Sequence, residues 1–566
     1  MQTISTKKTK NLSLKMRSPE KVMRLSRMGA SFQTRLSFSR TLTRRISKEE
    51  WKFEPIIFDI DNDGYGISVL SVHTKDNTYS LVAFTNLIPP EERTDRVVAD
   101  VWDSTFSLFD GIPNKIDLNR LALNTPRQEA GRFSPKELVL ARANKSLRLF
   151  DHVVSRLSDG CQPDVDLLKS VGYLMRTTAV YGSGKFGCSD REKISMRPEF
   201  AGAFQVELLT VYLIRWFTIK LVEYVASCRG GENAVSLNPE IGKFLGIGNA
   251  TGLGMAPFMI KHPILINNWV LAREKALLRI ISIKFYKKEK YYLFKKLLVQ
   301  SILHMNEWNV EDKKQNLKIK KSKEEISLLN KWCSIKKNIK DHFLWERILC
   351  FVEENYSMET QELIVSILLE IHGEIIDELE NIMNTSEDLK LNPSMNLKQL
   401  KGIIELYFEW ALKIDYEDPE KQRRFWYYSE EKLEPRFGDR FNDPGAEKEM
   451  PLAIGRDISR LYKKICDLKE NISVGIFLQS HAEYRGTIKR VQTLKNYPYA
   501  EIRDNLIDSE VCPIDLLRFK LAFFGASKFD PKSDLWTRIT LFQGAPLPNN
   551  FANDESDEWP FPTSPS

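Results

Sequence analysis

Several features that mark common classes of protein are scarce in this chain of 566 residues. Its seven cysteines lie far apart and include no CxxC pair, which excludes a disulfide-rich scaffold and a cysteine-based zinc module. Its seven histidines show no HExxH or HxH spacing, so no metal is expected. No GxSxG turn or cysteine-nucleophile signature is present, which disfavours acyl transfer. The identity of any cofactor stays unknown.

Long uncharged apolar runs are also missing. The most apolar stretch, residues 205 to 226, contains Glu207, Arg215, Lys220 and Glu223, whereas a membrane-spanning helix needs about 20 residues with few or no charges. We therefore expect no transmembrane segment. Together with the scattered cysteines, this favours an intracellular protein of the cytoplasm, or of an organelle in a eukaryote.

Positive charge is concentrated in residues 1 to 48, which contain 13 Lys or Arg and one acid and so carry +12, while the remainder carries −5. We treat residues 1 to 50 as a basic N-terminal arm. Three interpretations compete: a transit peptide, an arm that binds nucleic acid or anionic lipid, and a structural arm packed across the acidic body of the same or a partner subunit. Phe32, Leu36 and Phe38 would anchor a docked arm, so we favour the third.

Residues 51 to 90 contain the only convincing alternation of apolar and polar residues. Turn signals at residues 62 to 64 and 75 to 77 predict a small three-stranded antiparallel β-meander. Asp59, Asp61 and Asp63 match the opening of a calcium-binding loop, but Leu70 replaces the glutamate of its twelfth position. We interpret the segment as a hairpin turn.

After residue 90 the patterns favour helices, so the fold class expected is mainly α, with the N-terminal meander as its α+β element. The strongest signal is a capping box of Ser134 and Glu137, which predicts a helix over residues 135 to 157. Further helices are expected over residues 93 to 109, 164 to 178, 197 to 225, 263 to 308, 323 to 354, 359 to 383, 397 to 414, 451 to 470 and 515 to 524. The body divides into a helical core (91 to 310), a second helical region (311 to 545) and an extended or disordered tail (546 to 566).

Lysines crowd residues 284 to 321, whereas residues 359 to 380 are acidic. We expect helices that pack side by side with oppositely charged faces. A nucleic-acid surface built on Lys288, Lys290 and Lys295, with Tyr291 and Tyr292 as stacking groups, is the disfavoured alternative.

The first candidate site is a glycine-rich loop, residues 182 to 187. Gly182 and Gly184 would let main-chain N–H groups turn toward an anion. Positive charge would come from Arg176, Lys185 and Arg197. The segment is not a P-loop, because alanine and phenylalanine occupy the positions of its first glycine and its hydroxyl residue. A helix C-cap and a tight turn without a ligand are the alternative.

The second candidate site is a glycine-rich loop, residues 246 to 254. Asn249 and Thr251 would present an amide and a hydroxyl to a substrate. A dinucleotide-binding fingerprint is excluded, because Thr251 occupies the position of its third glycine. Close packing of helices is the alternative use of these glycines.

Proton transfer near these loops would need a titratable side chain, and the candidates are Tyr181, His262 and His481. His481 belongs to a polar cluster in which Arg485 would bind a carboxylate or phosphate; a solvated helix face is the alternative. Arg215, in the most apolar helix, needs a partner, and Glu207 or Glu223 would supply it.

We expect an enzyme that binds an anionic small molecule, a carboxylate or a phosphate, at the two glycine-rich loops, with its reaction unknown. A helical scaffold or homo-oligomer is one alternative, and a nucleic-acid-binding protein that uses the basic arm is another. The enzyme hypothesis requires residues 176 to 187, 246 to 262 and 481 to 485 to meet at one pocket.

Overall fold

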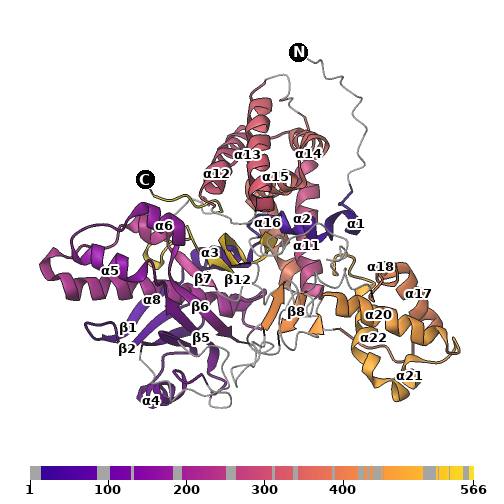
Figure 1. The fold of residues 1–566 in the computed structure, drawn as a ribbon, viewed down its shortest axis with the longest axis horizontal. Coiled ribbons are helices and arrows are strands. Elements are labelled where there is room, and N and C mark those ends of the chain that lie inside the picture. The colour runs from indigo at the N-terminus through magenta and orange to yellow at the C-terminus, as the bar shows by residue number, and fades with distance from the viewer. Residues whose placement is uncertain are drawn as a thin grey trace.

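The expectation of a mainly helical body is wrong, because the chain builds a nine-stranded mixed sheet (Figure 1). The computed structural model describes residues 15–85, 102–128, 133–182, 194, 196–249, 263–308, 313–335, 339, 342–384, 389–417, 426–429, 434–437, 448–449, 451–500, 518–519, 522–533, 536–551 and 560–565. The strands are β1 (Lys52–Ile60), β2 (Gly66–His73), β3 (Thr78–Thr85), β4 (Ser104–Asp110), β5 (Glu137–Lys145), β6 (Tyr173–Tyr181), β7 (Gly246–Asn249), β11 (Ala526–Ser533) and β12 (Trp536–Leu541). Their order is β1-β2-β3-β4-β5-β6-β7-β12-β11, so the predicted meander supplies only the first three.

The helix predicted over residues 135 to 157 is instead strand β5 followed by α5 (Phe150–Ser158). The capping-box residues do pair, since the Ser134 N–H donates to the Glu137 carboxylate at 2.5 Å, but the pair closes a turn in front of a strand. Strand β5 reads as a nearly continuous apolar run because it is buried on both faces. Periodicity alone does not separate such a run from a buried helix.

The helix predicted over residues 164 to 178 is wrong for a similar reason. Helix α6 (Val165–Val171) stops at Gly172, which has a left-handed φ of 74°, and the chain continues as β6. A glycine in this conformation is a common helix terminator. Residues 104 to 109, also predicted as helix, belong to β4.

Two helices cover the two faces of the sheet (Figure 1). One face of the sheet, which we call the α8 face, packs on α8 (Gln205–Gly230). There the rings of Phe106 of β4 and Phe217 of α8 lie 5.6 Å apart. The opposite face, which we call the α4 face, is covered by α4 (Lys115–Asn124) and carries a smaller core, in which Leu121 of α4 packs with Phe109 of β4. Successive residues of β4 and β5 therefore face different surroundings.

Strands β6 and β7 pair in parallel, whereas the other neighbouring strands of this sheet are antiparallel. They are connected through η3 (Pro198–Phe200), α8, η4 (Gly231–Asn233) and α9 (Pro239–Phe244). Because the strands run in the same direction, the chain leaves both of them at the same end of the sheet. The first glycine-rich segment begins there, after β6, whereas the second begins within β7 at Gly246.

The remaining helices form two bodies (Figure 1). The first consists of α11 (Pro263–Ile281), α12 (Lys288–Asn306), α13 (Lys313–Ser334), α14 (Leu344–Asn355), α15 (Met358–Glu370), α16 (Gly373–Leu379) and η7 (Glu380–Asn384). The second, which we call the C-terminal helical cluster, consists of α17 (Leu397–Tyr407), α18 (Glu409–Leu412), α20 (Pro451–Cys466), α21 (Val474–Ser480), η9 (Ala482–Tyr484) and α22 (Arg485–Leu494) and has its own apolar core. A separate sheet joins β8 (Trp426–Ser429), β9 (Glu434–Phe437) and β10 (Lys448–Glu449).

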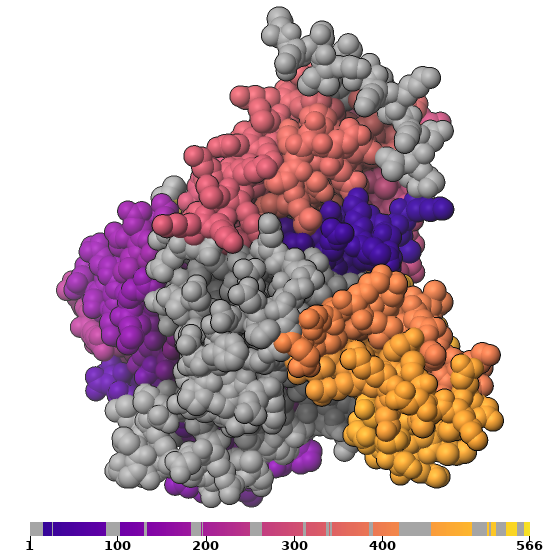
Figure 2. All heavy atoms as spheres, turned by 45° about the vertical axis from the view of Figure 1, so that its right-hand side comes forward, coloured from indigo at the N-terminus to yellow at the C-terminus, as the bar shows by residue number. Residues whose placement is uncertain are grey.

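The described part of the basic arm packs on the same chain. It contains α1 (Pro19–Val22), α2 (Leu25–Gly29) and α3 (Phe38–Lys48), and Figure 2 shows it wedged between the α12–α15 helices and the C-terminal helical cluster. The expected anchors Phe32, Leu36 and Phe38 are all buried.

Most acidic side chains of residues 359 to 380 form ion pairs with the basic arm. Lys290 of α12 pairs with Glu374 at 2.9 Å, as the complementary charges predicted. Other acids pair with arginines of the arm: Arg40 with Glu370, and Arg44 with Glu380 at 3.2 Å. The helices of the acidic segment therefore bind the arm as well as the lysine-rich helix.

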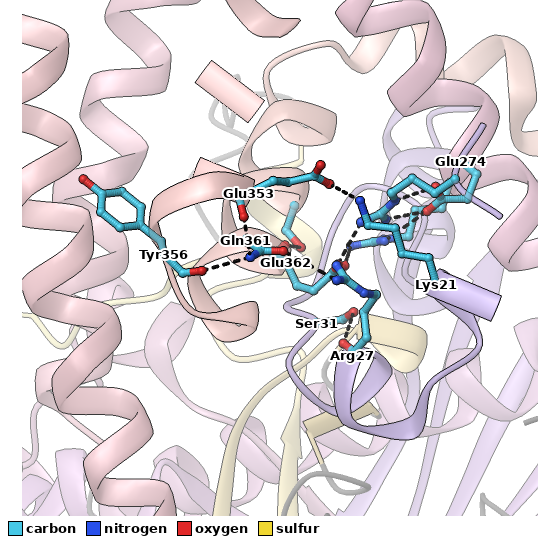
Figure 3. A network of polar contacts seen from close by, with 11 residues as sticks. Lys21, Arg27, Ser31, Glu274, Glu353, Tyr356, Gln361 and Glu362 are labelled. Atoms are coloured by element: carbon cyan, nitrogen blue, oxygen red, sulfur yellow. Dashed lines mark hydrogen bonds and ion pairs between the residues drawn. The ribbon is translucent and has the colours of Figure 1, made fainter. Parts of the chain in front are cut away.

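Glu362 of α15 lies at the centre of this interface and is fully buried (Figure 3). Its carboxylate accepts from Arg27, from Arg17 Nη1 at 2.8 Å and from Arg273 Nη2 at 2.8 Å. Arg17 also reaches Glu274 of α11 through Nη2 at 2.6 Å. Burial alone raises the pKa of Glu362, but the three guanidinium groups outweigh it and hold that pKa well below its usual range.

The described parts of the tail, which was expected to be extended or disordered, pack on the chain. The Tyr212 hydroxyl of α8 donates to the Pro546 carbonyl at 2.8 Å. Near the C-terminus, His304 Nδ1 lies 2.8 Å from the Pro562 carbonyl, and Ser564 bonds to Glu307. Described residues near both ends of the chain, such as Val22 and Phe561, therefore contribute to the core.

We predict that Glu362→Gln lowers the free energy of unfolding by about 3–5 kcal/mol, because it leaves buried guanidinium groups without their carboxylate. Urea unfolding measures this change. Glu378→Gln is the matched control: its pair with Arg279 is exposed, and we expect a loss of less than about 1 kcal/mol. Equal losses in the two variants would contradict the central role of Glu362.

Acid should weaken the same interface. A carboxylate whose pKa is lower in the folded than in the unfolded chain stabilises the fold above the unfolded value, about 4.3, and this contribution disappears as the pH falls below it. We therefore expect the stability difference between wild type and Glu362→Gln to be constant from pH 7 to pH 5 and to shrink towards pH 3. A difference that stays constant over the whole range would refute the prediction.

Candidate functional site

Strand β5 brings a buried arginine, Arg142, to the α4 face of the sheet. Its neighbours along the strand, Ala141 and Ala143, belong to the core of the α8 face, so Arg142 lies on the other side. Its guanidinium packs over the Trp102 ring at 5.1 Å from the centroid, and the Trp102 indole in turn donates to the Pro126 carbonyl beyond α4. No pattern in the sequence indicates a role for this residue.

Arg142 is only 2% exposed, yet its Nε and Nη1 have no hydrogen-bond partner in the part of the chain that the structure describes. Burial lowers the pKa of the guanidinium, and the nearby Tyr181 partly offsets this effect. A buried, incompletely bonded arginine is unfavourable, since its lost hydration is not replaced.

Another charge on the same strand and face is fully satisfied. Glu137 is buried, and Arg120 of α4 binds both of its oxygens at 2.7 and 2.9 Å, with Ser134 donating as well. The hydrogen bonds raise the pKa of Arg120. The comparison shows that the fold can pair a buried charge here, so the state of Arg142 is a specific feature of its position.

Other buried polar atoms near Arg142 also lack partners among the described residues. Thr105 is the cross-strand neighbour of Arg142 on β4, and Ser107 lies two residues further along that strand. Thr125 and Gln128 follow α4, and Gln128 Nε2 is 3.5 Å from the Ala141 carbonyl of β5. The Thr105, Ser107 and Thr125 hydroxyls and Gln128 Oε1 are all buried and unbonded. We call these four residues and Arg142 the α4-face polar cluster.

Two of the predicted site residues come close to this cluster. Strand β6 pairs with β5 so that Tyr181 lies opposite Leu140, and Arg176 lies opposite Asn144. Both partners are two residues from Arg142, one on each side. A β-bulge between Arg142 and Ala143 shifts the pairing by one residue, so that Arg176 lies on the α4 face together with Tyr181.

Asn249 and Gly182 lie at the same end of the sheet as Tyr181. Asn249 is the last residue of β7 and pairs with Thr177 of β6. Gly182 follows β6 and lies against α8, because a Cβ there would come within 2.6 Å of Glu207 Oε1. Close approach to a carboxylate suits the packing interpretation of Gly182 better than an anion-binding one.

The first glycines of the second loop also serve packing. Gly246 and Gly248 are in strand β7, not in a loop. A Cβ at Gly248 would lie 2.9 Å from the Tyr173 ring, and one at Gly246 would lie 2.5 Å from the Leu541 carbonyl of β12. Glycine is needed here for the strands to approach.

Arg197 has a protein partner. Its guanidinium binds both oxygens of Asp110, at 2.6 and 2.9 Å, and also donates to the Tyr79 hydroxyl, which bonds to Glu199. The hydrogen bonds to Asp110 are the main reason that the pKa of Arg197 is raised. The charge expected to hold a substrate is thus neutralised within the chain.

His481 and Arg485 lie in the C-terminal helical cluster, well away from β6 and β7 (Figure 1). The His481 ring packs on Phe477 at 4.8 Å and lies 3.4 Å from the Glu483 carboxylate. The expectation that these residues share a pocket with Arg176 and Tyr181 is wrong. Gly184, Lys185, Thr251 and His262 lie outside the described residues.

Arg215 has partners, but they are not the predicted carboxylates. It donates to five backbone carbonyls, those of Gly242, Lys243, Leu245, Ala545 and Pro546. Burial lowers its pKa to about 10. Arg215 thus ties α9 and the segment after β12 to α8, and it fixes the start of β7.

No described helix has the length and apolar character needed to cross a membrane. Among the described residues, no three or more His, Cys, Asp or Glu are placed to hold a metal ion, and the Asp61 side chain bonds instead to the backbone of its own hairpin turn. No family model, curated protein or solved structure matches the chain. The chemistry of the α4-face polar cluster is therefore the main guide to function.

We predict that Gly246→Ala destabilises the protein by about 1–3 kcal/mol, because its Cβ meets the backbone of β12 and the strands must move. Gly402→Ala is the control, since Gly402 is in helix α17 with open space around it, and this change should stabilise by about 0.5–1 kcal/mol. Thermal unfolding measures both. A Gly246→Ala protein as stable as wild type would refute the packing role.

Proposed function

We propose that the protein binds a small anionic molecule, a carboxylate or a phosphate, on the α4 face of strands β5 and β6. The observation that carries this proposal is the buried guanidinium of Arg142, whose Nε and Nη1 lack partners among the described residues. An anionic group would accept hydrogen bonds from these nitrogens and offset the cost of burying the charge.

The surroundings of Arg142 support an anion over a neutral ligand. Arg176 adds a second positive charge on the neighbouring strand. Trp102 supplies a flat apolar wall that holds the guanidinium in place without using its N–H groups. Arginine is suited to carboxylate and phosphate because its planar fork can donate two parallel hydrogen bonds.

An enzyme is the form of this function that we favour. Tyr181 lies beside Arg142 and has a phenol that can donate or accept a proton. The ligand would be held by Arg142 and Arg176, and Tyr181 would exchange a proton with it. Asn249, the last residue of β7, lies at the same end of the sheet. The reaction class stays open.

The alternatives have less support. Nucleic-acid binding by the arm would need free positive charges, but in the described part of the arm Arg17, Arg27, Arg40, Arg44 and Arg45 all bond to carboxylates or carbonyls of the same chain. An arm that wraps a neighbouring subunit is disfavoured for the same reason. An intracellular location is part of the proposal, and the five free cysteines of the described residues support it.

Arg142→Met separates a binding role from a structural one. Methionine fills a similar volume without a charge, so in the absence of anions we expect the variant to be as stable as wild type or more stable by roughly 1 kcal/mol. Succinate or phosphate should stabilise wild type, by about 2.7 kcal/mol at a ligand concentration of 100 times the Kd, and so raise its melting temperature. Neither anion should raise the melting temperature of the variant.

Arg279→Gln is the control for this experiment, because Arg279 forms an exposed pair and its loss should leave the response to anions unchanged. Strong destabilisation by Arg142→Met, with the response to anions retained, would show that Arg142 is structural and would overturn the proposed function.

A further inference from the structure

Gln128 has an unusual position for a buried amide. It follows α4 and is only 2% exposed, and its backbone adopts a left-handed φ of 52°. Glutamine seldom occupies this region, and such residues persist where the surrounding structure holds them. The side chain is thereby fixed over β5, next to Arg142.

The hydrogen bonds of Gln128 identify which end of its amide is free. Its Nε2 donates to the Thr125 carbonyl at 2.8 Å and lies 3.5 Å from the Ala141 carbonyl. Exchanging the two ends of the amide would place an oxygen against both carbonyl oxygens, so this orientation is the favourable one. Oε1 is left without a partner among the described residues, and it can only accept a hydrogen bond.

Gln128 and Arg142 border the same polar surface. Ala141, whose carbonyl faces Gln128, directly precedes Arg142, and Trp102 links Arg142 to Pro126, two residues before Gln128. A ligand large enough to carry two functional groups would reach both side chains.

We propose that the ligand carries, beside its anionic group, a hydroxyl or amino group that donates a hydrogen bond to Gln128 Oε1. This inference rests on the proposed function and narrows its substrate class to hydroxy acids, amino acids and polyol phosphates. Arg142 binds the anion, and Gln128 distinguishes these compounds from simple acids. A ligand without a donor leaves Oε1 buried and unbonded, which weakens its binding.

Matched pairs of compounds test the inference: malate with succinate, lactate with propionate, and glycerol 3-phosphate with propyl phosphate. Each pair shares its anionic group and differs in hydroxyl groups. For the pair that fits the site, we expect wild type to bind the hydroxylated member with a Kd about three- to tenfold lower, measured by calorimetry and by the shift in melting temperature.

Two variants locate the effect. Gln128→Met removes the hydrogen-bond acceptor and keeps the length of the side chain. Gln128→Asn keeps an amide but shortens the side chain, so that the amide oxygen no longer reaches the ligand. Asparagine also tolerates the left-handed backbone, which guards against a failure to fold. Both should bind the two members of the pair with equal affinity. Arg142→Met should bind neither.

The possible outcomes separate the two proposals. Equal binding of both members by wild type, or a preference that survives in Gln128→Met and Gln128→Asn, would overturn the role of Gln128 and leave the anion site intact. A wild type that binds no member of any pair would overturn the anion site itself.

Discussion

The cost of burying a charge determines much of this structure. Arginines and glutamates are drawn into the interior, and each must recover the hydrogen bonds that it loses on leaving water. Glu362 does so by sharing three guanidinium groups, two of them from the basic arm, and this joins the N-terminus to α15 and α11. Arg215 does so with five backbone carbonyls, and this sets the position of β7 beside β6. Arg142, in the described structure, remains incompletely bonded, and this makes it a candidate for ligand binding.

The sequence predicted those elements whose local signals agree with their environment. The strands of residues 54 to 86 were recognised by their alternating residues and by the turn signals between them, and α8 was recognised by its long apolar run. Strand β5 was missed because it is buried on both faces and so lacks alternation. Strand β6 was missed because the predicted helix was continued past its stop at Gly172. The Ser134–Glu137 pair was a real interaction assigned to the wrong element, since such a pair also closes a turn. Strands β11 and β12 join the sheet through partners almost 300 residues away, which no local pattern indicates.

The candidate site was predicted less well than the fold. Arg176, Tyr181 and Asn249 were chosen for their nearness to glycines, and their strands do lie side by side, but through parallel pairing of β6 and β7 instead of the folding of loops between helices. Gly246 and Gly248 reflect close packing of strands. Arg142 and Gln128 gave no signal, because an arginine in an apparent helix reads as a solvated side chain, and a glutamine after a helix reads as a loop residue. A search for charged residues within β-rich apolar runs would have selected Arg142, once β5 had been recognised.

The residues around Arg142 indicate that its state is not an accident of packing. Its cross-strand neighbours are Thr105 on β4 and Ala179 on β6. An aspartate or glutamate at either position would lie within reach of the guanidinium and form a cross-strand ion pair. The chain has that arrangement nearby, where Arg120 satisfies Glu137. Beside Arg142 it has a small side chain and a neutral hydroxyl, neither of which offsets the charge. Sites that hold a charge in this way lower the stability of the free protein and recover it on binding. The ion network around Glu362 supplies stability elsewhere in the same chain, so the fold can tolerate this loss.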